Sequence, residues 1–120
     1  MKLYFKNLTK KKISKDFFKK VILDFLKRKK IDSKNLELGI LICGERKIRN
    51  LNKKYRKIDK VTDVLSFGIE KKVLKKEIPL FLGDIVICIN QAEKNAKKLG
   101  HSLKEELKIL IEHSLSHILS

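Results

Sequence analysis

The sequence predicts a single α+β domain, residues 1–120, in which four helices pack on a four-stranded mixed sheet. Three observations support this prediction. A chain of 120 residues suits one domain with one modest core. Apolar residues recur every second position in some segments and at helical spacing in others, which gives the element order β-α-β-α-β-β-α-α. No repeat, low-complexity linker or break in composition divides the chain.

The first half of the chain alternates strands with helices. Residues Lys2–Lys6 alternate apolar and polar side chains and fit a short strand. The segment Ser14–Lys29 carries apolar side chains at helical spacing, which predicts an amphipathic helix whose apolar stripe covers a sheet. Leu36–Cys43 is an apolar run that predicts a second strand, and Glu45–Arg56 has the spacing of a second helix.

The middle of the chain predicts the remaining two strands, Asp63–Ile69 and Leu80–Ile89. Lys71–Lys76 is a polar connection, and Pro79 permits only a strand start or an edge position. Asp84 lies inside the second of these strands. A carboxylate in an apolar strand must be hydrogen-bonded, paired or close to a metal, so a structural role and a site role both stay open.

The last thirty residues predict two helices. We expect Asn90 to cap a short helix that runs through Leu99 and ends at Gly100. Ser102 and Glu105 form a capping-box pattern that starts the final helix. The buried stripe of the final helix is predicted to contain Leu103, Leu107, Leu110, Ile111, Leu115 and Ile118.

The charge of the chain is strongly positive and unevenly spread. Lysine and arginine number 30 against 14 acidic residues, for a net charge of +16. Residues 1–30 hold twelve basic and two acidic side chains, whereas residues 61–120 hold nine and eight. A basic surface favours a polyanion such as nucleic acid, because each neutralised phosphate releases counterions. A lysine-rich genome would give the same excess, so both explanations stay open.

The remaining composition indicates a cytoplasmic protein. No apolar run approaches the roughly 20 residues of a membrane span, and the N-terminus lacks the apolar region of a signal peptide. Cys43 and Cys88 lie in apolar, strand-like runs. We therefore expect buried thiols in a reducing compartment rather than a disulfide.

Two histidines near the C-terminus are the candidate metal ligands. His113 and His117 are four residues apart, which places both imidazoles on one face of the final helix. Two nitrogens so placed can bind one zinc ion together with further ligands. Metalloproteases use the same spacing with a glutamate after the first histidine, but Ser114 occupies that position here. Two histidines on an amphipathic helix without any metal remain the alternative.

Three stretches together resemble one protein family. The segment 48–67, IRNLNKKYRKIDKVTDVLSF, is similar to the family's LN-x-x-YR-x-x-D-x-x-TDVLSF segment. Leu82–Ile87 (LGDIVI) is similar to its LGDI-x-I strand, and His113–His117 resembles the start of its H-x-x-x-H-x-x-x-x-x-H metal motif. Over essentially its whole length, the chain thus resembles the YbeY ribosomal RNA maturation factors, which are metal-dependent single-strand endoribonucleases.

The resemblance implies one zinc ion held by three histidines, with water in the fourth position. His113 and His117 match the first two ligands. The third would lie six residues beyond His117, past residue 120, so we expect the C-terminus of this domain to be incomplete. His101 is the remaining histidine and lies roughly 18 Å from His113 at the helical rise per residue, too far to complete the site within one chain. Cys88 and Asp84 could approach from a neighbouring strand.

The resemblance also implies an arginine close to the metal. Arg56 matches it and is the candidate for binding the scissile phosphate and the charge that builds in the transition state. A surface guanidinium paired with Asp59 is the alternative. We expect Thr62, Asp63 and Ser66 to shape the cleft and to satisfy hydrogen bonds at the strand end.

Two functions are compatible with these observations. The first is a zinc-dependent single-strand endoribonuclease in ribosomal RNA processing and ribosome maturation, with ribosomal RNA and the small ribosomal subunit with its proteins as partners. The second is a catalytically inactive RNA- or ribosome-binding module that lacks the third zinc ligand. A zinc peptidase is disfavoured because Ser114 replaces the base. Few aromatic side chains are expected to be free for base stacking, since Tyr4, Tyr55 and Phe67 are predicted to lie in the core.

Overall fold

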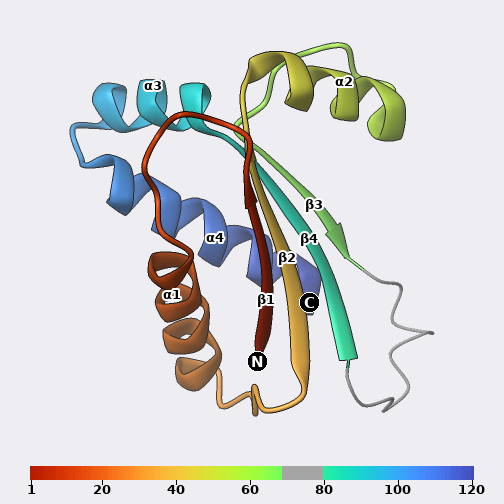
Figure 1. Cartoon of the computed structure of the whole chain (residues 1–120), viewed down its shortest axis with the longest axis vertical. Coiled ribbons are helices and arrows are strands. Elements are labelled where there is room, and N and C mark those ends of the chain that lie inside the picture. The colour runs from red at the N-terminus through yellow and green to blue at the C-terminus, as the bar shows by residue number, and fades with distance from the viewer. Residues whose placement is uncertain (69–79) are drawn as a thin grey trace.

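The computed structural model describes residues 1–68 and 80–120. Within this part of the chain, strands and helices follow the predicted order (Figure 1). The elements are β1 (Lys2–Asn7), α1 (Lys15–Arg28), β2 (Leu36–Cys43), α2 (Glu45–Arg56), β3 (Val64–Gly68), β4 (Leu80–Cys88), α3 (Ile89–Leu99) and α4 (Leu103–Leu119).

The strands form one mixed sheet in the order β1-β2-β4-β3. β1 is parallel to β2 and β2 is parallel to β4, whereas β3 runs antiparallel to β4 at one edge. The predicted single α+β domain with a four-stranded mixed sheet is therefore confirmed. The polar connection predicted at 71–76 and the proline at 79 lie outside the described residues.

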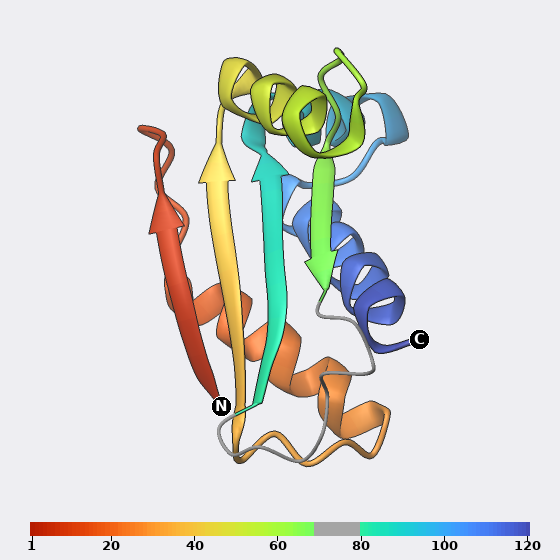
Figure 2. The same cartoon turned by 90° about the vertical axis from the view of Figure 1, so that its right-hand side faces the viewer.

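The helices divide between the two faces of the sheet. α1 and α4 cover one face, and α2 crosses the strand ends on the other side (Figures 1 and 2). The main core lies between the sheet and the first pair of helices. Its fully buried side chains include Phe18, Ile22 and Leu26 of α1, Leu38, Ile42, Ile85 and Ile87 of the central strands, and Leu107, Ile111 and Leu115 of α4. A smaller cluster beneath α2 contains Cys43, Ile48, Leu65, Val86 and Cys88.

Local capping explains where the helices begin and end. The Ser14 hydroxyl accepts a hydrogen bond from the Phe17 amide and caps α1. Ser102 and Glu105 form the predicted capping box at the start of α4. Gly100 closes α3 in the left-handed conformation, as predicted.

The start of α3 differs from the prediction. β4 ends at Cys88, which is itself the N-cap residue, and Ile89 already belongs to the helix. Asn90 therefore lies inside α3 and does not cap it. The apolar run did not reveal this boundary because Ile89 is buried like the strand residues before it.

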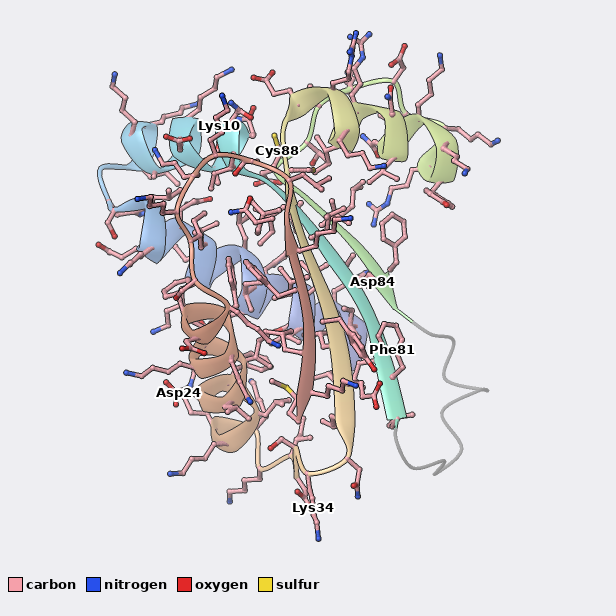
Figure 3. All side chains as sticks on the ribbon, viewed as in Figure 1. Lys10, Asp24, Lys34, Phe81, Asp84 and Cys88 are labelled. Carbon is pink, nitrogen blue, oxygen red and sulfur yellow. The ribbon has the colours of Figure 1, made fainter. Side chains whose placement is uncertain are left out.

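A β-bulge in β4 explains the carboxylate in the apolar strand. The register between β2 and β4 shifts between Glu37 and Gly39, so that Gly39 lies opposite Asp84. Gly83 has a φ of 142°, and the bulge turns the Asp84 side chain to the face away from α1 and α4 (Figure 3). Asp84 is therefore exposed rather than enclosed in the core.

Candidate active site

The two candidate metal ligands lie on the exposed side of α4. His113 and His117 are both exposed and one helical turn apart, which puts their Cβ atoms roughly 5–6 Å from each other. The next residue, Ile118, packs against the end of β3: a methyl group added to Gly68 would meet the Ile118 side chain at 3.5 Å. The histidine pair thus lies beside the edge strand β3.

The neighbours of His113 do not supply a protease-type base. Ser114 is buried on the core side of α4, and its hydroxyl has no hydrogen-bond partner among the described residues. Glu112 forms an ion pair with Arg28 of α1. The disfavoured peptidase function therefore gains no support from the structure.

The other residues that the sequence offered as metal ligands do not lie beside His113 and His117. The His101 ring donates to the buried Glu106 carboxylate over 2.7 Å, close to the start of α4. Cys88 is buried in the cluster beneath α2, and Asp84 lies on the opposite face of the sheet. Residues 1–68 and 80–120 contain no group of three or more histidine, cysteine or carboxylate side chains that could hold a metal. The described residues therefore supply two ligands and not a complete zinc site.

Arg56 approaches the same edge strand from the other side. It is the last residue of α2, and its Nη2 donates to the carbonyl oxygen of Ser66 in β3 at 3.4 Å. Asp59 pairs instead with Arg49, whose Nε lies 2.8 Å from the carboxylate. This hydrogen bond lowers the pKa of Asp59 and raises the pKa of Arg49. The alternative in which Arg56 pairs with Asp59 is therefore wrong.

The candidate site is the edge of β3 that lies between Arg56 of α2 and the last turn of α4. Arg56 bonds to Ser66, and the last turn of α4 packs on Gly68, two residues further along the strand. Since α2 and α4 lie on opposite sides of the sheet (Figure 2), the strand is flanked by a guanidinium on one side and by the turn carrying His117 on the other.

Residues at the start of β3 satisfy hydrogen bonds, as predicted. The Asp63 carbonyl accepts from the Cys88 amide at 2.9 Å, and the Asp63 carboxylate accepts from the Asn95 amide group at 3.1 Å. The Thr62 hydroxyl donates to the same carboxylate at 3.4 Å. These contacts tie β3 to β4 and α3, and so fix the position of the edge strand.

Tyr4 and Tyr55, which were predicted to lie in the core, are exposed, whereas Phe67 packs against the cluster beneath α2. Tyr4 is 46% exposed, Tyr55 is 57% exposed and Phe67 is half-buried. One signal for Tyr4 was present in the sequence, because it occupies a polar position in the alternation of β1, between the inward-facing Leu3 and Phe5. The prediction that Tyr4 and Tyr55 lie in the core was therefore wrong.

Comparisons with known proteins agree with the resemblance. A family model described as Endoribonuclease YbeY matches residues 4–120. The protein of that name from Aquifex aeolicus is 49% identical over 85 residues, which cover 71% of this chain and 55% of that protein. The protein of that name from Dehalococcoides mccartyi is 38% identical over 121 residues, covering 92% of this chain and 75% of that protein. A solution structure from Thermotoga maritima has a TM-score of 0.64 and 21% identity, and covers 98% of this chain and 72% of that chain.

The chain is an α+β domain, and the proteins that it is similar to form a class named as endoribonucleases, which are hydrolases. Within that class, the chain belongs to the YbeY family. The likeness to the Thermotoga structure shows the fold alone, and the chain spans little more than half the length of the Aquifex protein. In the part of the chain that the structure describes, no helix combines the length and apolar character that a membrane crossing requires.

Proposed function

We propose that the protein containing this chain is a zinc-dependent endoribonuclease that cleaves single-stranded RNA during ribosomal RNA processing in the cytoplasm. Its partners would be ribosomal RNA and the small ribosomal subunit with its proteins. Family membership supports RNA hydrolysis. A net charge of +16 supports attraction to a polyanionic substrate.

The observation that carries the proposal is the placement of Arg56 and the histidine pair around β3. His113 and His117 would supply two zinc ligands, and the third would come from outside the described residues. A bound zinc ion would polarise a phosphoryl oxygen and activate water. The planar Arg56 guanidinium would bind a phosphate through two parallel N–H groups and stabilise the negative charge that develops on it. Among the described residues its side chain donates one long hydrogen bond, to the Ser66 carbonyl oxygen, and Arg56 is exposed.

The chain offers a matched pair of arginines for the test. Arg56 and Arg49 are both exposed residues of α2, but Arg49 is held by Asp59. In the full-length protein, we expect Arg56→Ala to reduce single-turnover cleavage of single-stranded RNA by about 10²–10³-fold, the loss typical of one charge-stabilising donor. Arg49→Ala should retain cleavage. Equal turnover by both variants would remove Arg56 from the mechanism.

One observation favours the alternative, a catalytically inactive RNA- or ribosome-binding module: residues 1–68 and 80–120 provide only two ligands. Zinc content separates the two functions. We expect one zinc ion per full-length chain, purified without chelators or a histidine tag, and its loss in His113→Ala. RNA binding without zinc and without cleavage would establish the inactive module.

A further inference from the structure

A concave surface lies on the sheet face opposite α1 and α4. It is an open groove of about 680 Å³, within the usual range of ligand sites. Residues of all four strands and of α2 line it, and α2 crosses the ends of the strands on this side of the sheet (Figure 2). The side chains that matter for its chemistry are Tyr4, Lys6, Lys47, Tyr55, Phe67 and Asp84.

Aromatic rings stand at two places along this groove. Tyr55 of α2 and Phe67 of β3 meet edge to face, with ring centroids 5.4 Å apart. Tyr4 of β1 and Phe81 of β4 meet in the same way at 6.4 Å. Because Tyr4 and Tyr55 are about half exposed, a planar group can stack on each of them. Aromatic faces exposed on a sheet are typical platforms for single-stranded bases.

Lysines lie beside both tyrosines, and the Tyr4 hydroxyl donates a hydrogen bond to the Glu37 carboxylate at 2.9 Å. Lys6 of β1 and Lys47 of α2 line the groove from opposite sides. The Lys2 ammonium lies 4.8 Å from the centre of the Tyr4 ring, and the Lys54 ammonium lies 5.2 Å from that of Tyr55. Aromatic and cationic groups side by side suit a nucleic acid strand, whose bases stack on the rings while its phosphates bind the cations.

Asp84 is the acidic group on the groove floor. Its carboxylate lies over the backbone of Gly39, so closely that a methyl group on Gly39 would overlap the carboxylate oxygen. Apolar surroundings raise the pKa of this side chain. A carboxylate can accept hydrogen bonds from the amino group of a base, as it does from cytosine N4. Phosphates would instead be held at the lysine-bearing walls.

We propose that this groove binds a segment of single-stranded RNA, with bases stacked on Tyr4 and on Tyr55, phosphates at Lys6 and Lys47, and one base amino group bonded to Asp84. The inference rests on the proposed function and deepens it by locating substrate contacts away from the bonds that are cut. Tyr55 immediately precedes Arg56, so a strand leaving the groove passes the β3 edge where cleavage is proposed.

Affinity for a labelled eight-nucleotide single-stranded RNA, followed by fluorescence anisotropy, tests the groove. The double variant Lys6→Glu/Lys47→Glu is compared with Lys19→Glu/Lys20→Glu, which makes the same charge change on the exposed face of α1. The groove variant should weaken binding at least tenfold more than the α1 variant. Tyr55→Ala should weaken binding about tenfold, the effect of one lost stacking contact, whereas Tyr55→Phe should bind like wild type.

The remaining outcomes overturn the inference. Equal weakening by the groove and α1 variants would mean that RNA responds to overall charge alone. Unchanged RNA binding with lost association of ribosomal proteins would make the groove a protein-docking surface. Either result leaves the proposed function standing, because the Arg56 comparison measures single-turnover cleavage at saturating enzyme, where a weaker affinity for RNA no longer limits the rate. If every variant of the candidate active site still cleaved RNA and the groove still bound it, the proposed function alone would be removed.

Discussion

Replacing Gly83 by alanine should destabilise the domain far more than the same replacement at Gly100. Both glycines have positive φ, 142° and 73°. At Gly100 an added Cβ meets no atom within 4 Å, whereas at Gly83 it would lie 2.2 Å from the Phe67 carbonyl oxygen and 2.9 Å from the Gly68 Cα. These are backbone atoms of the paired strand β3, so they cannot move without disturbing the β3–β4 ladder.

The expected magnitudes follow from this geometry. Alanine at a positive φ costs about 1–2 kcal/mol, which is the full expected effect at Gly100. At Gly83 the displacement of β3 adds to this cost, for a total of roughly 3–5 kcal/mol. Urea unfolding followed by circular dichroism measures both variants, and the melting temperature of Gly83→Ala should fall by roughly 12–20 °C. Equal losses of stability at the two positions would refute the close approach of Gly83 to the backbone of β3 as the source of the added cost.

Three further predictions concern buried groups and the groove floor. Ser114→Ala should raise the free energy of unfolding by about 1 kcal/mol, since it removes a buried hydroxyl without a partner among the described residues; a lower urea midpoint would contradict this. Burial raises the pKa of Cys43 to about 11 from 9.0, so its stabilisation is present below pH 9 and is lost as the pH rises from 9 to 11. Cys43→Ala should flatten that part of the stability curve, and an unchanged slope would exclude the thiol. Gly39→Ala should destabilise the domain less in an Asp84→Ala background, because the overlap is with the Asp84 side chain; additive effects in the double-mutant cycle would show that the two residues do not interact.

Much of the fold could be predicted because the sequence periods are strong. The limits of β2 and α2 coincide with the predicted Leu36–Cys43 and Glu45–Arg56. β2 ends at a sequence signal, since Gly44 follows it. α2 instead closes at Lys57 in the left-handed conformation, which glycine usually adopts and which a lysine does not signal. The strand predicted at Asp63–Ile69 is observed as Val64–Gly68, and residue 69 lies outside the described part.

The features that prediction missed depend on tertiary structure. Whether Arg49 or Arg56 pairs with Asp59 is decided by how the loop after α2 returns over the helix, and sequence spacing does not encode that path. The face of the sheet on which the Asp84 side chain lies depends on a bulge in β4, and only the pairing of β4 with β2 reveals that bulge. The spacing of His113 and His117 placed both on one helix face, but a metal site also needs ligands from other elements, which the spacing cannot identify.

Site-specific cleavage of single-stranded RNA by the full-length protein is the most direct test of the central claim. Wild type is compared with the double variant His113→Ala/His117→Ala, and with Lys108→Ala as a control on the exposed surface of the same helix. We expect wild type and Lys108→Ala to cut at the same positions and rates, and the histidine variant to leave the RNA intact while keeping its circular dichroism spectrum. Undiminished cleavage by a folded histidine variant would contradict the assignment of these residues to the active site.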